Sequence, residues 1–328
     1  MSSKKPDRVK ICVIGAGRWG NNHIKTLHSL GALGGVVENH EATRQERQIQ
    51  YPDIPFFQDV ADAVATGFDG FTVATPAETH YAIAKYILNH GFPVLVEKPV
   101  TLNAADAREL YELSLEKKAT LMVGHVMLFH PAVQKIRELV SSGKIGKLQY
   151  LYSNRLNLGR VRQEENILWS FAPHDISIFQ YLIGRMPVEV TSTGGIFLQP
   201  NIHDTTLTVL KYPGNTIGHI FVSWLHPFKE HRLVIIGSDG MLSYEDSSTD
   251  KSLFFYQKGY ECKNGVPVKL DGPMEVIPFE QEMPLTREFQ YFLSNLDGRD
   301  VEIAGGRNGV EVLEILEQAT DNLITGVH

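Results

Sequence analysis

Short runs of apolar residues alternate with segments of helical apolar spacing from the start of the chain to Gly124. The runs are rich in Val and Ile and are continuous, which is typical of parallel strands covered on both faces. Strands separated by helices in this way predict a doubly wound α/β domain. The expected strands are 9–14, 35–38, 70–74, 93–96 and 120–124. One helix is expected to start at residue 21, and three more are expected over 59–65, 79–89 and 103–117.

After Pro131 the pattern changes to long segments in which apolar and polar residues alternate. Such alternation predicts an antiparallel sheet with one packed and one exposed face. We therefore expect an α/β domain over 1–126 and, over 127–328, an α+β domain with a large, mostly antiparallel open sheet. Its expected strands are 147–158, 188–198, 205–212, 216–225, 232–237 and 241–244, and its expected helices are 132–142, 174–182, 285–296 and 310–323.

Composition narrows the class of protein. The 328 residues are enough for about two domains. Lys and Arg number 31 against 38 Asp and Glu, so the formal charge of −7 disfavours nucleic acid or an anionic membrane as partner. The apolar run 11–16 is too short for a signal peptide core or a membrane span, and we expect a soluble, cytoplasmic protein.

A glycine pattern follows the first expected strand. Gly15, Gly17 and Gly20 form G-x-G-x-x-G between that strand and the next helix. In this setting the first glycine permits a tight turn, the second lets a pyrophosphate approach the backbone, and the third allows close packing of helix and strand. The helix N-terminus offers unpaired amides to the phosphates. The pattern predicts a Rossmann-type dinucleotide site.

The end of the second expected strand indicates which dinucleotide binds. Glu38 stands there, where a carboxylate accepts hydrogen bonds from the ribose hydroxyls of the adenosine and repels a 2′-phosphate. NAD is therefore the expected cofactor. Arg44 is a nearby partner for a phosphate and leaves NADP as the alternative.

Two further segments lie at expected strand ends: T-P-x-x-x-H over 75–80 and E-K-P over 97–99. With the glycine turn, in this order and spacing, they resemble the Gfo/Idh/MocA oxidoreductases. The resemblance covers nearly the whole chain and includes 129–132 and 284–289. It implies NAD as cofactor for the domain over 1–126, and substrate binding and oligomerisation for the domain over 127–328. No metal is expected. The cofactor-binding residues that motif and resemblance together indicate are Gly15, Gly17, Arg18, Trp19, Gly20, Glu38, Thr75, Pro76, His80, Glu97 and Lys98.

The resemblance gives Lys98 a catalytic role, because the lysine of E-K-P lies by the nicotinamide and the reacting carbinol in that family. A lysine at a strand end can stabilise a developing alkoxide or transfer a proton while hydride leaves carbon. The family's D-x-x-x-H segment aligns with residues 170–174, so that Ser170 replaces the aspartate. His174 is the expected general base. Asp175 follows it and is expected at the start of a helix.

Several arginines precede the expected base in the sequence. The guanidinium group matches phosphate and carboxylate, so the arginines from 155 to 162 indicate an anionic substrate. The segments 165–175 and 222–227 resemble the UDP-N-acetylglucosaminuronate 3-dehydrogenases of surface-polysaccharide synthesis, which implies oxidation of a nucleotide-sugar 3-hydroxyl. The expected substrate-binding residues are Lys98, Arg155, Asn157, Arg160, Arg162, His174 and Asp175.

Other functions stay open at this point. Within the family, the alternatives are an inositol or free-sugar dehydrogenase and a 3-ketosugar reductase. From another class, the alternative is a non-catalytic dinucleotide-binding regulatory protein. The enzyme hypothesis requires Lys98 and His174, from separate domains, to converge on one alcohol. An open sheet needs cover for its exposed face, and together with the family resemblance this implies a homodimer or homotetramer.

Overall fold

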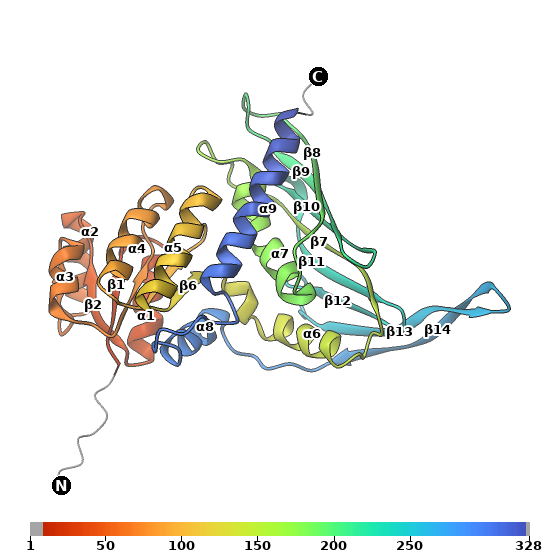
Figure 1. Cartoon of the computed structure of the whole chain (residues 1–328), viewed down its shortest axis with the longest axis horizontal. Helices are drawn as coiled ribbons and strands as arrows, with labels where there is room; N and C mark the ends of the chain where they lie inside the picture. The colour runs from red at the N-terminus through yellow and green to blue at the C-terminus, as the bar shows by residue number, and fades with distance from the viewer. Residues whose placement is uncertain (1–8, 326–328) are drawn as a thin grey trace, which may run out of the picture. The chain divides into compact units, whose positions relative to one another are not determined.

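The computed structural model describes residues 9–325, which form two compact units (Figure 1). The first unit consists of residues 9–126 and 283–313, and the second of residues 127–282 and 314–325. The chain leaves the first unit after Val126, where the first domain was expected to end. The return of 283–313 to the first unit differs from the expectation.

A six-stranded parallel sheet forms the centre of the first unit, in the order β3-β2-β1-β4-β5-β6. The chain therefore winds outward in both directions from β1 and β4, which confirms the doubly wound arrangement. The carboxyl ends of these two strands flank the point where such sheets bind ligands. Cys12 in β1 is fully buried with a free thiol. The strands are β1 (Ile11–Ile14), β2 (Leu33–Val37), β3 (Phe56–Phe57), β4 (Gly70–Val73), β5 (Val94–Glu97) and β6 (Leu121–Gly124).

One α-helix and one strand of this unit were not predicted. The helix α2 (Glu41–Gln50) has no buried residue, so no apolar face marks it in the sequence. The strand β3 has only two residues. The other elements before Val126 are α1 (Gly20–Ser29), α3 (Val60–Thr66), the short 3₁₀ helix η1 (Ala77–Thr79), α4 (His80–Asn89) and α5 (Ala104–Lys117).

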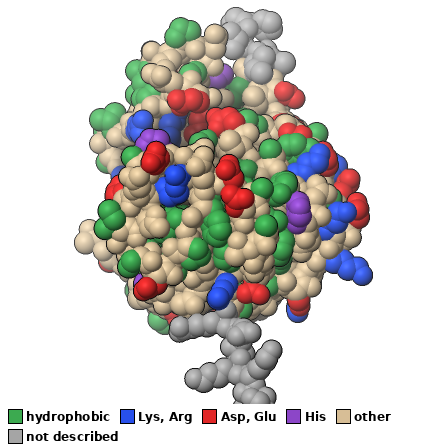
Figure 2. Space-filling view, turned by 90° about the vertical axis from the view of Figure 1, so that its left-hand side faces the viewer, with side chains coloured by type: hydrophobic (Ala, Val, Ile, Leu, Met, Phe, Trp, Pro, Cys, Tyr) green, Lys and Arg blue, Asp and Glu red, His purple; other side chains and the backbone are tan. Residues whose placement is uncertain are grey.

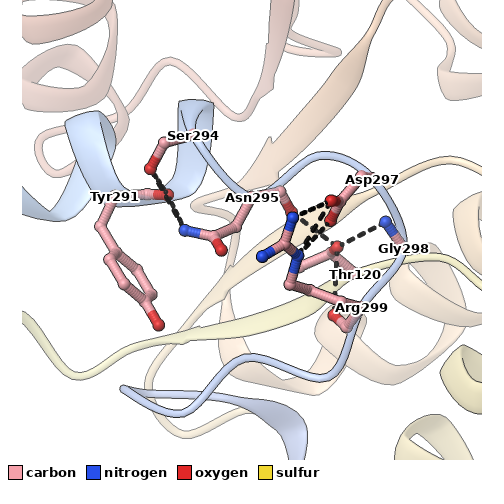
Figure 3. Close-up of polar contacts among 7 residues, drawn as sticks. All are labelled: Thr120, Tyr291, Ser294, Asn295, Asp297, Gly298 and Arg299. Carbon is pink, nitrogen blue, oxygen red and sulfur yellow. Dashed lines mark hydrogen bonds and ion pairs between the residues drawn. The ribbon is translucent and has the colours of Figure 1, made fainter.

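Hydrogen bonds at the start of β6 attach segment 283–313 to the first unit (Figure 3). The buried hydroxyl of Thr120 donates to the carbonyl oxygen of Asn295 at 2.7 Å and accepts from the amide of Gly298 at 3.1 Å. Because a buried hydroxyl needs such partners, this loop completes the first unit. The expectation of one domain over 127–328 is therefore wrong for this segment. The helices beside the loop are α8 (Pro284–Leu293) and α9 (Gly306–Thr325).

The second unit contains an eight-stranded sheet in the order β14-β13-β12-β11-β7-β10-β9-β8. Of its neighbouring pairs in the described chain, β7 and β10 run parallel and the others antiparallel. Helix α7 packs on one face (Figure 1). On the other face Tyr150 and Ile217, partners across β7 and β10, are 42% and 39% exposed. The elements are η2 (Val126–Phe129), α6 (Pro131–Ser141), β7 (Leu148–Leu158), α7 (Ile167–Ile183), β8 (Glu189–Gly195), β9 (Thr205–Tyr212), β10 (Thr216–Ser223), β11 (Leu225–Gly237), β12 (Met241–Glu245), β13 (Leu253–Lys263) and β14 (Val266–Ile277).

Helix α7 begins earlier than expected. The side chain of Asn166 caps it by accepting a hydrogen bond from the amide of Trp169 at 3.1 Å, and Pro173 lies inside the helix. Proline usually interrupts a helix, which is why the sequence pattern placed the start beside it. Asp175 consequently lies in the middle of α7, and its expected place at the helix start is wrong.

The hairpin of β13 and β14 was also not predicted. It extends beyond the neighbouring strands of the sheet (Figure 1), and no residue of β14 is buried. A strand without a packed face does not show the pattern of one apolar and one polar side that identifies strands in a sequence.

No helix among the described residues combines the length and the apolar character needed to cross a bilayer. On the face shown in Figure 2, Lys and Arg side chains are interspersed with Asp and Glu.

Candidate active site

The turn between β1 and α1 requires glycine for its shape. Gly15 has a φ of 94°, and a Cβ on it would lie 2.8 Å from the carbonyl oxygen of Ala74. A Cβ on Gly20 would lie 1.9 Å from the carbonyl oxygen of Gly15, so the start of α1 packs directly on the turn. A Cβ on Gly17 would have no atom within 4 Å. The backbone at Gly17 is thus open to close approach by a phosphate group.

A cavity of about 400 Å³ adjoins this turn at the carboxyl ends of β1, β2 and β4. Its size lies in the range of small-molecule sites. It is the place where a doubly wound sheet binds a nucleotide. The predicted cofactor residues that line it are Gly15, Gly17, Glu38, Thr75 and Pro76.

The carboxylate of Glu38 is fixed at the cavity wall. Its two oxygens accept hydrogen bonds from the amides of Ala16 at 2.8 Å and His40 at 2.9 Å. The guanidinium group of Arg44 donates to the backbone carbonyl of Glu38 at 2.8 Å. A carboxylate held in this way presents negative charge where the adenosine ribose is expected, so the cavity residues fit NAD.

His80 of the T-P-x-x-x-H segment does not line the cavity. It is 1% exposed, and its ring nitrogens lie 2.9 Å from the carbonyl oxygen of Thr75 and 2.8 Å from that of Pro99. His80 therefore joins the T-P segment at the cavity to the E-K-P segment.

Glu97 is the centre of a buried network at the end of β5. It is 8% exposed and accepts hydrogen bonds from the indole of Trp19, from Nε2 of His23 at 2.9 Å and from the amide of Lys98 at 3.3 Å. The other ring nitrogen of His23 lies 3.2 Å from the hydroxyl of Thr72. Burial raises the pKa of Glu97, but the hydrogen bonds that it accepts, from His23 above all, hold it below its usual value. Trp19 thus links the glycine turn to the E-K-P segment.

A second buried histidine lies near Lys98. His125 follows β6 directly and is 2% exposed. Burial lowers its pKa to about 4, with Glu97 raising it and Lys98 lowering it. The surroundings of Lys98 in the first unit therefore include one carboxylate and one neutral imidazole. Arg18, in the glycine turn, is exposed.

In the second unit, α7 carries His174 and Asp175. Asp175 is 2% exposed, and its carboxylate accepts hydrogen bonds from the hydroxyl of Ser153 and from Nε of Arg155 at 2.8 Å and Nη2 at 3.0 Å. Consecutive helical residues point about 100° apart, so Asp175 faces the sheet while His174 points elsewhere. Asp175 thus binds the residues of β7. Arg155 lies within that strand, as the strand expected over 147–158 implies.

The remaining expected substrate residues lie at the end of β7 or just after it. Asn157 is in β7, and Arg160 is exposed in the following loop. Nε of Arg162 lies 3.9 Å from a carboxylate oxygen of Glu165. Because Lys98 belongs to the first unit and His174 to the second, their convergence stays a prediction. Within the described residues no group of three or more His, Cys, Asp or Glu is arranged to hold a metal ion.

Comparisons with known proteins identify the chain's relatives. Residues 9–125 match the family described as "Oxidoreductase family, NAD-binding Rossmann fold", and residues 133–243 match "GFO/IDH/MocA C-terminal domain". The chain belongs to the Gfo/Idh/MocA family. Residues 9–125 are the NAD-binding Rossmann domain of that family, which confirms the expected cofactor and fold.

Two relatives of this Gfo/Idh/MocA chain have names or structure titles that mention a UDP-sugar. UDP-N-acetylglucosamine 3-dehydrogenase of Acidithiobacillus ferrooxidans is 24% identical over 307 residues, which cover 92% of this chain and 93% of the relative. A structure of that enzyme has a TM-score of 0.85, covering 97% of this chain and 98% of that one. The WlbA dehydrogenase from Bordetella pertussis, solved with NADH and UDP-GlcNAcA, has a TM-score of 0.78 at 18% identity, and 98% of each chain is covered.

Four residues of this Gfo/Idh/MocA chain that surround Glu97 were not predicted from the sequence. Thr72 and His23 lie in elements that were predicted, but neither belongs to a motif. His125 follows β6 as Lys98 follows β5, and this position at a strand end is the signal that was available. Glu288 lies in segment 284–289, which supported only the resemblance.

Proposed function

We propose that this NAD-dependent oxidoreductase oxidises the 3-hydroxyl of a nucleotide sugar, UDP-N-acetylglucosaminuronate, to a ketone. The observation that carries the proposal is the coupling of the NAD cavity to the E-K-P lysine. Trp19 bonds the glycine turn to Glu97, and His80 bonds the cavity wall to Pro99. The relatives named for UDP-sugar oxidation or solved with UDP-GlcNAcA support the choice of substrate.

In the proposed reaction, the residues of this chain handle the proton and the charge. NAD, when bound, accepts the hydride. Lys98 stabilises the negative charge that develops on the substrate oxygen. His174 accepts the hydroxyl proton as general base, a role that suits a group whose ordinary pKa lies near neutrality. The same two residues serve the reverse reaction, so a 3-ketosugar reductase is the same proposal with the direction reversed.

The anionic parts of the substrate are assigned to residues that follow β7. Arg160 and Arg162 are positioned on the loop between β7 and α7, the helix that carries His174. A guanidinium group binds phosphate or carboxylate with two parallel hydrogen bonds. We assign the diphosphate and the uronate carboxylate to this loop and to Asn157. Arg155 already pairs with Asp175 and contributes its remaining N–H groups.

An inositol or free-sugar dehydrogenase is the second candidate. The pairing of Arg155 with Asp175 favours it, because one fewer guanidinium group is then available to an anion. Inositol 2-dehydrogenase of Rhizobium meliloti is a relative with this activity in its name, 25% identical over 203 residues, which cover 60% of this chain and 61% of the relative.

The test is to mix the protein with NAD and each candidate sugar and to follow the absorbance of reduced nicotinamide. We expect reduction with UDP-N-acetylglucosaminuronate and none with myo-inositol. Reduction with inositol alone would contradict the proposed substrate. Binding of NAD without reduction by any sugar would instead support the regulatory alternative.

Replacing Glu38 with alanine is expected to weaken NAD relative to NADP. Its carboxylate accepts from the ribose hydroxyls, and a charged hydrogen bond of this kind contributes about 1.5–3 kcal/mol, or about 10- to 100-fold in affinity. Dissociation constants of both cofactors, measured by fluorescence titration, give the ratio. Glu41→Ala is the control, because Glu41 lies in the exposed first turn of α2. An unchanged ratio would remove Glu38 from the ribose site.

We also propose that copies of this chain associate through the open face of the eight-stranded sheet. Tyr150 and Ile217 lie exposed on that face, and apolar patches of this kind are usually covered in an assembly. The molar mass measured by light scattering should be that of a dimer or a tetramer. A monomer at micromolar concentration would contradict this proposal.

A further inference from the structure

Helix α8 carries an acidic side chain into the interior of the first unit. Glu288 is 0% exposed, and neither of its carboxylate oxygens has a hydrogen-bond partner among the described residues. The next residue, Phe289, packs edge-on against the ring of His23 with centroids 5.0 Å apart. Glu288 therefore lies beside the network of Glu97, on the helix whose Phe289 contacts His23.

Two buried carboxyl groups near each other do not both ionise at neutral pH. Glu97 accepts three hydrogen bonds, from Trp19, His23 and the amide of Lys98, and each stabilises its charged form. Glu288 accepts none. Burial, and then the charge of Glu97, raise the pKa of Glu288 well above its usual value. In this pair Glu97 carries the charge and Glu288 carries the proton.

The other titratable groups around the pair are His23, His125 and Lys98. His23 is hydrogen-bonded through both ring nitrogens, to Thr72 and Glu97. His125 is already neutral, because burial keeps its pKa at about 4. Lys98 supplies positive charge next to Glu97. Among these groups, Glu288 is the carboxylic acid that keeps its proton, and its carboxyl oxygens have no hydrogen-bond partner among the described residues.

We propose that Glu288 is a positioning residue that adjusts the charge beside Lys98 to the redox state of the cofactor. It does so by releasing one proton when the oxidised cofactor binds and regaining one after reduction. The inference rests on the proposed function, which places the nicotinamide ring next to Lys98. The ring is positively charged in NAD⁺ and neutral in NADH. Positive charge favours a second carboxylate, so Glu288 loses its proton to solvent when NAD⁺ binds and recovers one from solvent after the ring has been reduced.

The sign of the resulting pH dependence follows from linkage. Bound NAD⁺ lowers the pKa of Glu288, so NAD⁺ binds more tightly as the pH rises from the bound pKa towards the free pKa. One linked proton gives at most about tenfold in affinity per pH unit. NADH lacks the charge, so Glu288 gives its affinity no such slope. A residue that only filled space would leave both cofactors with equal slopes.

The test measures proton release by titration calorimetry in two buffers of different ionisation heat, at about pH 6–9, the range in which buried glutamates titrate. The wild type should release up to one proton with NAD⁺ and none with NADH. Glu288→Gln should bind both cofactors and release none. Glu302→Gln, at an exposed residue of the same segment, is the control and should behave as the wild type.

Two outcomes would overturn the inference. One is equal proton release with NAD⁺ and NADH in the wild type, which needs no variant. The other is unchanged release in Glu288→Gln. Should that variant not fold, Glu288→Asp, which keeps the acid, must retain the difference between the cofactors. Failure of the wild type to bind either cofactor would instead contradict the proposed function.

Discussion

Replacing Lys98 with alanine is expected to leave NAD binding largely intact and to lower turnover by about 10²-fold or more, as for a group that transfers a proton or stabilises an alkoxide. The side chain follows β5, and Glu97, not Lys98, makes the hydrogen bonds to Trp19 and His23 that hold the glycine turn. The measurement is kcat under saturating NAD and sugar, together with the dissociation constant of NAD.

Two variants make this result specific. Lys25→Ala removes an exposed lysine from α1 and should leave turnover unchanged. Lys98→Arg keeps the charge but removes the capacity to lose a proton, because arginine stays protonated in proteins. Partial recovery with arginine would assign Lys98 an electrostatic role, and no recovery would assign it proton transfer. Near-normal turnover of Lys98→Ala would exclude the residue from the mechanism.

Asp175→Ala should destabilise the protein by about 3–5 kcal/mol, the cost of breaking a buried ion pair from one side. Its carboxylate is 2% exposed and the side chain of Arg155 is 12% exposed, so the guanidinium group would stay in the interior without its partner. The hydroxyl of Ser153 would also lose its acceptor. Urea unfolding followed by circular dichroism measures the free energy of unfolding.

The double variant Asp175→Leu with Arg155→Met is the matched control. Replacement of both partners by apolar side chains removes the uncompensated charge, so it should recover much of the lost stability. A loss below about 1 kcal/mol in Asp175→Ala, the value of an exposed ion pair, would contradict the burial of this pair.

The fold was predictable where apolar residues define a face. Continuous Val and Ile runs indicated the parallel strands of the first unit, and alternation indicated most of the strands of the second. Helix α2 and strand β14 lack a buried face and were missed. The start of α7 was misplaced because Pro173 lies inside the helix, a conformation that Asn166 stabilises through its cap.

The site was predictable where a backbone or a strand end requires a particular residue. The glycine turn, Glu38 and the T-P segment all reach the cavity. The contacts of Trp19 with Glu97, and of Asp175 with Arg155, join residues far apart in sequence, and no local pattern records them. Glu288 was hidden for the same reason, since its neighbours come from β5 and α1.

The return of segment 283–313 has a consequence for the synthesis of the protein. A nascent chain that has emerged only as far as β6 lacks the loop that bonds to Thr120 and the aromatic ring that packs on His23. Its nucleotide-binding half is then unfinished, although all six parallel strands have left the ribosome. We expect this half to reach protease resistance only after translation has passed α8, long after the strands themselves are made.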